Sequence, residues 1–249
     1  MVQLARPSVQ SLLIQTQADG RPIATASGFL VQSRFGPLLI TNRHVLTGRD
    51  QNTQQVFAPN GDTPTEVIII HNRKDAVGQW LARVEPLYDG PVKRWFEHPV
   101  LGAKMDVAAL RLTALNDVET YPFDLADPGT DMLLGPGDAV SVVGFPFGQT
   151  AGGNMLPVWA TAFLASEPVQ NFADLPIQLV DCRTLAGQSG APVIAYRSSG
   201  DVAMNDGGVA RFDGPVLRFL GVYGGRVTAA ADLGVVWKAA ALKELVDAL

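Results

Sequence analysis

The chain has 249 residues, of which 47% are hydrophobic and 17% are charged, and its formal net charge is −5. This balance excludes a disordered chain and is unlike that of a nucleic-acid-binding protein, which clusters Lys and Arg against phosphates. The 25 glycines and 17 prolines are spread along the sequence and favour short strands joined by many turns, hence an all-β architecture.

The first half is predicted to be a meander of short strands. Runs rich in β-branched and large apolar residues alternate with turn-forming Gly and Pro segments. A polar loop is expected at 48–65 and an irregular stretch at 93–104. The predicted strands are 11–15, 27–32, 37–41, 66–70 and 107–112.

The second half is predicted to form a separate strand-rich unit. Three acids, a proline and a glycine interrupt the apolar pattern at 124–131 and mark a connection between domains. We therefore expect a first domain at 8–123 and a second at 132–237. The strands expected in the second domain are 139–143, 156–163, 177–180, 191–195, 219–223 and 234–237.

The last segment changes its period. Trp237, Ala241, Leu242, Leu245 and Leu249 are spaced as one face of a helix. Residues 238–249 are therefore predicted to be a helix that packs on the domain before it.

Cys182 is the single cysteine, so an intrachain disulfide framework is excluded, which indicates a reducing compartment or a bacterial lineage. Residues 1–25 contain only one short apolar run, at 12–14, and predict neither a signal peptide nor a membrane span. We expect a cytoplasmic protein, although a secreted form trimmed of its leader would show the same pattern. One cysteine and three scattered histidines lack metal-ligand spacing, so no metal site is predicted.

Three residues in distinctive settings carry the chemistry. His44 ends the run Ile-Thr-Asn-Arg-His, Asp106 precedes an apolar Val-Ala-Ala-Leu run, and Ser189 lies in Gly-Gln-Ser-Gly. A serine hydroxyl is a poor nucleophile near neutral pH, and it needs an imidazole base that is oriented by a carboxylate. The chain order His, Asp, Ser is that of the chymotrypsin-type triad.

Other arrangements fit less well. All three histidines precede Ser189, which excludes an α/β-hydrolase, whose histidine follows the nucleophile. A subtilisin-type order needs an aspartate before His44, and the candidate, Asp19, lies in a turn segment. Taken singly, His44 could be a structural histidine and Asp106 a partner of Arg111, but their joint occurrence in order favours catalysis.

Gly187 has a mechanical reason to precede the nucleophile by two residues. An oxyanion hole needs backbone N–H groups that point at the developing negative charge, and a side chain would obstruct the turn. We predict that the N–H groups of Gly187 and Ser189 form this hole.

These motifs together resemble the chymotrypsin-like serine peptidases, in particular their disulfide-poor bacterial branch, which includes the glutamyl endopeptidases and the HtrA-type proteases. The resemblance implies two perpendicular six-stranded β-barrels, with the triad in the cleft between them, and a C-terminal α-helix. The matching segments span nearly the whole chain and are 28–31, 40–45, 106–108, 143–148, 187–192 and 220–224.

Two positions depart from the pattern of the digestive enzymes, and Cys182 departs from that of relatives that use a cysteine nucleophile. Gln188 stands where members activated by trimming carry an aspartate that pairs with the new N-terminus, so activation by trimming is not expected. Val222 replaces a serine that supports the catalytic aspartate in many relatives, so support for Asp106 is expected to be weaker or to come from elsewhere. Cys182 lacks the Gly-x-Cys-Gly setting of cysteine-dependent relatives and is expected to be a buried apolar residue.

The resemblance also implies a substrate pocket. Arg183 is placed near its base, where it would favour an acidic residue before the scissile bond, with a structural ion pair or a solvent-facing arginine as the alternative. Thr184 and Gly224 would line the pocket. The backbone of Tyr223 and Gly224 would add to an extended substrate strand.

The sequence therefore predicts a serine endopeptidase that hydrolyses a protein or peptide substrate without a cofactor. The alternative is a protease-fold binding or regulatory module that is catalytically silent. A cytoplasmic protease without a zymogen device needs another restraint, either narrow specificity or a regulatory protein partner that remodels the cleft. No nucleic-acid or membrane partner is predicted.

Overall fold

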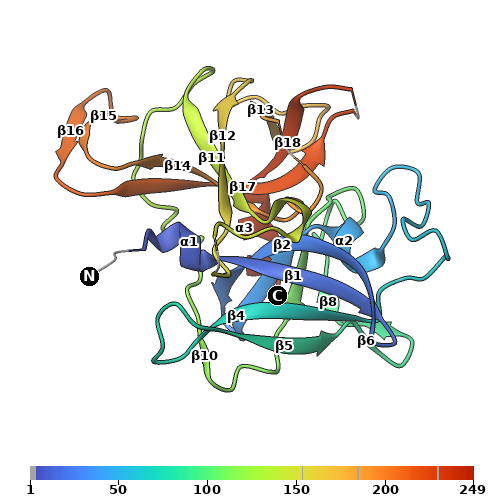
Figure 1. The fold of residues 1–249 in the computed structure, drawn as a ribbon. Coiled ribbons are helices and arrows are strands. Elements are labelled where there is room, and N and C mark those ends of the chain that lie inside the picture. Colours follow the sequence, from blue (N-terminus) through green and yellow to red (C-terminus); the bar gives the residue numbers. More distant parts are fainter. Residues whose placement is uncertain (1–3, 153, 184, 229) are drawn as a thin grey trace.

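The computed structural model describes residues 4–152, 154–183, 185–228 and 230–249 (Figure 1). Strands dominate these ranges, and all the helices are short. In chain order the elements are α1 (Arg6–Gln10), β1 (Ser11–Ala18), β2 (Arg21–Ser33), β3 (Gly36–Thr41), α2 (Arg43–Thr47), β4 (Glu66–Arg73), β5 (Trp80–Pro86), β6 (Tyr88–Asp89), β7 (Val92–Lys93), β8 (Trp95–Phe96), β9 (Ala108–Arg111), β10 (Val118–Glu119), β11 (Ala139–Gly144), the 3₁₀ turn η1 (Pro146–Gly148), β12 (Val158–Leu164), β13 (Ile177–Asp181), β14 (Pro192–Arg197), β15 (Gly200–Ala203), β16 (Val209–Phe212), β17 (Val216–Arg226), β18 (Leu233–Lys238) and α3 (Ala239–Asp247).

The N-terminal half is an antiparallel sheet built from six longer strands in the order β5-β4-β1-β2-β3-β9. The two-residue strands β8 and β10 pair with β9 and β4. Burial alternates along β1, where Ile14, Thr16 and Ala18 are buried and the residues between them are half-buried. This period of two is expected of a strand with one face on a core.

The C-terminal half is a closed barrel in the order β11-β12-β13-β18-β17-β14. Figure 1 shows it above the N-terminal sheet, with the β15–β16 hairpin projecting from it. Glycine allows a close approach inside this barrel: Gly221 has φ +148°, and a Cβ there would lie 1.8 Å from the carbonyl oxygen of Trp237. A larger residue would therefore separate β17 from β18.

One hydrophobic core joins the two halves and α3. The ring centroid of Phe29 lies 5.4 Å from those of Phe123 and Phe219, so residues of both halves pack ring to ring. Leu242 and Leu245 of α3 are fully buried in the same cluster. The helix thus stabilises the contact between the halves, since apolar area from all three parts is removed from water together.

The structure confirms the predicted all-β class, a closed six-stranded barrel and the C-terminal helix. Each predicted strand segment falls on an observed strand, while part of the stretch at 93–104 forms β8 instead of irregular chain. The strand β5 was missed because it is an edge strand of mixed burial that lacks clean alternation. The domain boundaries 8–123, 132–237 and 238–249 stay a prediction.

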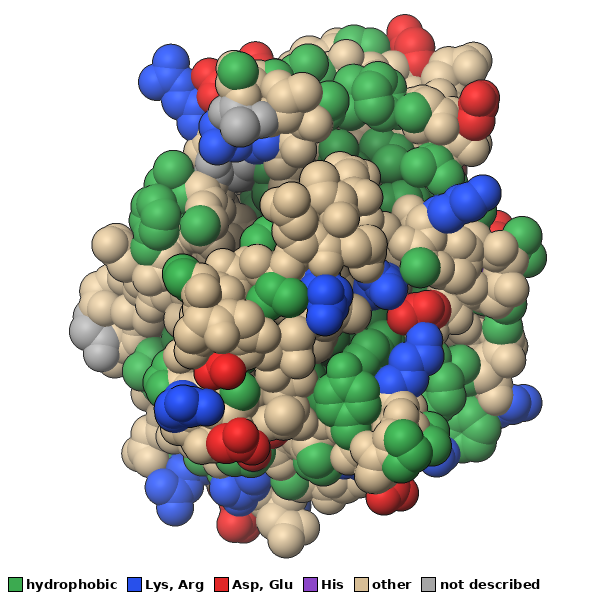
Figure 2. Space-filling model, turned by 90° about the vertical axis from the view of Figure 1, so that its right-hand side faces the viewer, with side chains coloured by type: hydrophobic (Ala, Val, Ile, Leu, Met, Phe, Trp, Pro, Cys, Tyr) green, Lys and Arg blue, Asp and Glu red, His purple; other side chains and the backbone are tan. Residues whose placement is uncertain are grey.

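The surface carries charges of both signs. Figure 2 shows Lys and Arg side chains interspersed with Asp, Glu and apolar side chains, without one large patch of a single sign on that face. Across the described residues, none of the helices combines the length and the apolar character that crossing a membrane requires.

Candidate active site

His44 is presented by a strand that runs directly into a short helix. The strand β3 ends at Thr41, Asn42 has extended backbone angles, and His44 is the second residue of α2. The helix stops after one turn because Gly48 adopts the left-handed conformation and donates its N–H to the carbonyl oxygen of His44. The imidazole is thereby held at the end of the sheet.

Asp106 lies against His44 because β9 pairs with β3. The register places Ala108 opposite Thr41, which brings the residues just before β9 beside those just after β3. His44 Nδ1 and Asp106 Oδ2 are 2.6 Å apart, and the backbone N–H of His44 donates to Asp106 Oδ1 at 2.9 Å. The aspartate is 4% exposed, so both of its oxygens hold the histidine in a site with little water.

Asn42 adds a support that the sequence reasoning did not identify. Its side-chain Nδ2 donates to the carbonyl oxygen of Asp106 at 2.6 Å, and the residue is fully buried. Support for Asp106 thus comes from Asn42 and from the backbone of His44. Val222, which stands where the resemblance implies a serine in many relatives, is fully buried in the shared core. The signal was available, since Asn42 lies in the same short motif as His44.

Ser189 sits on the turn that precedes β14, and this turn touches the strands that carry His44. The N–H of Ser27, in β2, donates to the carbonyl oxygen of Ser189 at 2.9 Å. Gly190 has φ +82°, and a Cβ there would meet the carbonyl oxygen of Ser27 at 2.2 Å and Thr41 Oγ1 at 2.3 Å. Only glycine lets the turn come this close to β2 and β3.

Hydrogen bonds hold His44 to Asp106, but none is described between His44 and Ser189. In the part of the chain that the structure describes, no hydrogen bond joins the hydroxyl of Ser189 to the imidazole. Catalytic hydrogen bonds are often long in proteins without substrate and shorten in the complex.

Gly187 occupies a backbone conformation that requires glycine. Its φ is +95°, and a Cβ would lie 2.4 Å from the carbonyl oxygen of Phe145 and 2.7 Å from the N–H nitrogen of Phe147. Among the described residues, the N–H groups of Gly187 and Ser189 have no acceptor within hydrogen-bonding distance. Two neighbouring free donors beside a serine are what an oxyanion hole requires.

A buried hydroxyl that the sequence reasoning also missed fixes this turn. Ser27 Oγ donates to the carbonyl oxygen of Gly187 at 2.8 Å and accepts the N–H of Phe145 at 2.9 Å. Ser27 is fully buried and belongs to the N-terminal sheet, whereas its two partners belong to the C-terminal half. Because the peptide that contains the Gly187 carbonyl is fixed, the turn before Ser189 has one orientation.

Gln188 closes the turn from the inside. Its side-chain Oε1 accepts the N–H of Leu185 at 2.9 Å, and the residue is 1% exposed. A neutral side chain therefore orders the turn locally, without the buried ammonium that an aspartate would require at this position.

The predicted pocket residues are placed as follows. Arg183 has a side chain that is 92% exposed, and its Nε lies 3.9 Å from Asp232 Oδ2. Thr184 lies outside the described residues. Tyr223 is 1% exposed, and its backbone N–H and C=O bond to Ala191 and Gly190, so its backbone serves the barrel.

The role of Gly224 beside an extended substrate strand stays a prediction. Gly224 lies at a register shift between β17 and β18, where regular pairing is interrupted between Tyr223 and Gly225. A Cβ at Gly224 would lie 3.0 Å from Trp237 Nε1, so the absence of a side chain matters at this point. Backbone at such a bulge is available to another strand.

Cys182 does not present an activated thiol. Burial, with the nearby charge of Asp181, raises the pKa of Cys182 to about 11. The thiol stays protonated near neutral pH, and a thiol is a much weaker nucleophile than a thiolate. Within the described ranges, no three His, Cys, Asp or Glu side chains come together as metal ligands.

Comparison with known proteins agrees with this geometry. Residues 26–203 match the family model described as a trypsin-like peptidase domain. No curated protein matches the chain.

Solved structures share the fold at low identity. The active form of the Rv3671c protease from M. tuberculosis is 16% identical with a TM-score of 0.52, covering 97% of this chain and 81% of that one. A serine endoprotease from Yersinia pestis is 12% identical with a TM-score of 0.52, covering 100% and 67%. The thermostable serine protease AL20 from an extremophilic microorganism is 12% identical with a TM-score of 0.53, covering 98% of both chains. The chain thus has the fold of these proteases.

The bond from Ser27 to Gly187 yields a prediction about turnover. In Ser27→Ala the Gly187 carbonyl and the Phe145 N–H both lose a buried partner, which costs about 1–3 kcal/mol per group. We expect kcat for a peptide substrate to fall by roughly tenfold or more, with a smaller change in KM.

The matched control is Ser11→Ala. Ser11 Oγ is also buried and donates across the two halves, to the carbonyl oxygen of Val143 at 2.7 Å, but it does not touch the turn before Ser189. Thermal denaturation of both variants measures the stability cost. If both lose equal stability and equal kcat, Ser27 has only a structural role.

Proposed function

Because the chain belongs to the family of trypsin-like peptidase domains, we propose that His44, Asp106 and Ser189 form the catalytic triad of this serine endopeptidase. The observation that carries the proposal is the pairing of both Asp106 oxygens with His44, through Nδ1 at 2.6 Å and the backbone N–H at 2.9 Å. This pairing leaves Nε2 of the imidazole as the nitrogen that faces a nucleophile.

In the proposed reaction Ser189 Oγ attacks the carbonyl carbon of the scissile peptide bond while His44 Nε2 takes its proton. Asp106 stabilises the imidazolium that forms. The N–H groups of Gly187 and Ser189 donate to the oxyanion of the tetrahedral intermediate. The same proton then passes from His44 to the leaving amine, and water repeats the sequence on the acyl-enzyme.

The substrate is a protein or peptide, since the family acts on peptide bonds. An extended substrate would lie along Gly224 of β17, whose backbone is at an interrupted register. No cofactor takes part in these steps, and a regulatory protein partner and a cytoplasmic location remain part of the proposal.

Removing triad members tests the assignment. We expect Ser189→Ala or His44→Ala to lower kcat by about 10⁶ and Asp106→Ala by about 10⁴, because the three residues act as one unit. The measurement is kcat for a fluorogenic peptide, with the exposed serine variant Ser199→Ala as the matched control.

A serine-directed phosphonate separates turnover from the silent alternative. An activated Ser189 is labelled stoichiometrically, as seen by mass spectrometry of the intact protein, and Ser189→Ala is not. Absence of labelling in the wild-type protein would favour the silent binding module.

The closure of the turn by Gln188 predicts that no free N-terminus is needed. A protein extended at its N-terminus by a cleavable tag is expected to have the same kcat/KM before and after the tag is removed, because Gln188 Oε1 already holds the N–H of Leu185. Gln188→Ala is expected to reduce activity in both forms. Activity that appears only after tag removal would contradict this role.

Arg183 yields a prediction about specificity. If its guanidinium pairs with an acidic residue before the scissile bond, Arg183→Ser lowers the ratio of kcat/KM for matched acidic and neutral peptides. Since the side chain is 92% exposed, we expect a loss of about fivefold at most, on the scale of up to about 1 kcal/mol for an exposed ion pair. The control is Arg211→Ser on the β15–β16 hairpin. If Arg183→Ser leaves the ratio unchanged, Arg183 serves only as the ion-pair partner of Asp232.

A further inference from the structure

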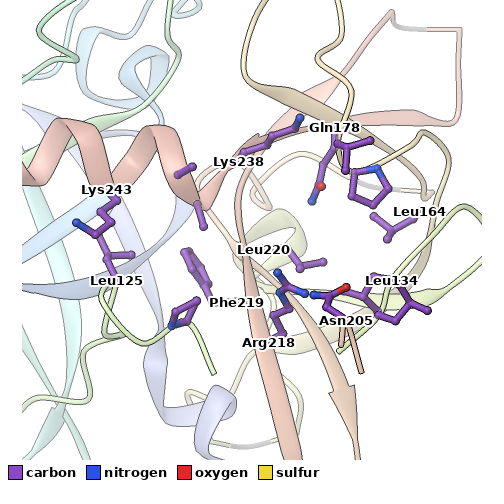
Figure 3. A pocket seen from close by; sticks show the side chains of 16 residues that line it. Leu125, Leu134, Leu164, Gln178, Asn205, Arg218, Phe219, Leu220, Lys238 and Lys243 are labelled. Atoms are coloured by element: carbon purple, nitrogen blue, oxygen red, sulfur yellow. The ribbon is translucent and has the colours of Figure 1, made fainter. Parts of the chain in front are cut away.

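A second concave site lies beside α3, apart from the triad. It is a cavity of about 510 Å³, a size that suits a small organic ligand. Figure 3 shows it between the start of α3, β13, β17 and the segment that contains Leu125. None of the residues that line it belongs to the proposed triad or oxyanion hole.

One part of the wall is apolar. Leu164 and Phe219 are almost fully buried behind it, and Leu125, Leu134 and Leu220 are half-buried at its surface. Leu133, at 55% exposed, extends this wall toward solvent. An apolar chain of several carbons would remove this surface from water.

The charged part of the lining is cationic. Arg218, Lys238 and Lys243 line the cavity, and no carboxylate does so among the described residues. Arg218 and Lys243 pair with Asp131 and Asp247. Lys238 is therefore the lining cation that lacks an acidic partner among the described residues.

Lys238 has only neutral partners among the residues that the structure describes. Its Nζ donates to the carbonyl oxygen of Gln170 at 2.5 Å and to Asn171 Oδ1 at 2.8 Å. Burial lowers the pKa of Lys238, because its ammonium is partly removed from water. A negative charge nearby would offset this desolvation.

The N-terminal end of α3 opens into the same cavity. Lys238 is the N-cap, the nine-residue helix has no side-chain cap and no acid in its first turn, and Ala239 and Ala240 line the cavity. The start of a helix carries partial positive charge and favours an anion.

Gln178 supplies an independent sign of a ligand. The residue is 4% exposed, and its Nε2 is buried without an acceptor. Figure 3 shows its amide end pointing into the cavity, into the space between Lys238 and Leu220. A buried donor without a partner is costly, and an acceptor bound in the cavity would satisfy it.

We propose that this cavity binds a medium-chain monocarboxylate, with its carboxylate at the start of α3 near Gln178 and Lys238 and its alkyl chain along the leucine wall. The carboxylate accepts the hydrogen bond of Gln178 Nε2 and neutralises the charge that the lining leaves unpaired. The alkyl chain covers Leu134, Leu164 and Leu220.

Isothermal titration calorimetry of the intact protein tests the ligand class. Sodium decanoate is expected to bind at least about tenfold more tightly than decanol, because only the acid makes charge-assisted hydrogen bonds, and decylammonium is expected not to bind. Affinity is expected to rise about fourfold for each methylene from hexanoate until the cavity is full. The heat of binding does not depend on peptide hydrolysis, so this test is independent of the proposed catalysis.

Variants place the ligand in the cavity. We expect Gln178→Leu to weaken decanoate binding by roughly fivefold and Lys238→Gln by roughly tenfold. Ala240→Trp is expected to abolish binding by filling the cavity from an exposed position, which leaves the core intact. The control is Lys74→Gln, an exposed lysine outside the cavity, with unchanged affinity expected.

Several results would overturn the proposal. Equal affinities for decanoate and decanol would mean that the leucine wall adsorbs any alkyl chain. Unchanged binding in Gln178→Leu, Lys238→Gln and Ala240→Trp would place decanoate elsewhere. Binding of an apolar peptide with a free C-terminal carboxylate, without binding of decanoate, would make the cavity a site for peptide ends.

Discussion

The contact between Ser27 and the turn before Ser189 is the interaction on which the arrangement of the site depends. Ser27 donates its N–H to the carbonyl oxygen of Ser189 and its hydroxyl to that of Gly187, so one residue of the N-terminal sheet fixes two peptide groups of the C-terminal half. The histidine and aspartate come from one half and the serine from the other. Any shift between the halves would therefore change the distance between the proposed nucleophile and its proposed base.

Close packing allows few other geometries at the contact between Ser27 and the turn before Ser189. Gly190 approaches β2 and β3 so closely that a Cβ would lie 2.2 Å from the carbonyl oxygen of Ser27, and Gly144 is equally confined, with a Cβ 2.6 Å from Ser27 Oγ. Because the backbones are packed this closely and little water is present, the hydrogen bonds of Ser27 tolerate few alternative geometries. The shared aromatic core of Phe29, Phe123 and Phe219 supplies the apolar burial that keeps the halves in register.

Features of the fold and the site that depend on short runs of neighbouring residues could be predicted from the sequence. The strand segments and the order of His44, Asp106 and Ser189 depend on short runs of residues, and the observed strands confirm the former. The roles of Asn42 and Ser27 could not be predicted in the same way, because their partners lie 64 and 160 residues away. The bond of Asn42 depends on the pairing of β3 with β9, and that of Ser27 on how the two halves meet. The same holds for the buried backbone of Tyr223, whose two partners follow from barrel closure.

Unpaired donors are present at both sites of the molecule. Among the described residues, the N–H groups of Gly187 and Ser189 have no acceptor beside the proposed nucleophile, and Gln178 Nε2 has none beside the start of α3. Donors such as the hydroxyl of Ser27 are satisfied within the protein. A fold keeps a desolvated donor unpaired at a cost of about 1–3 kcal/mol, which an incoming acceptor can offset. At the proposed triad that acceptor would be transient and would exist only while charge develops on the substrate. At the cavity it would be a stable ligand, because an apolar wall and an uncompensated cation accompany the donor there.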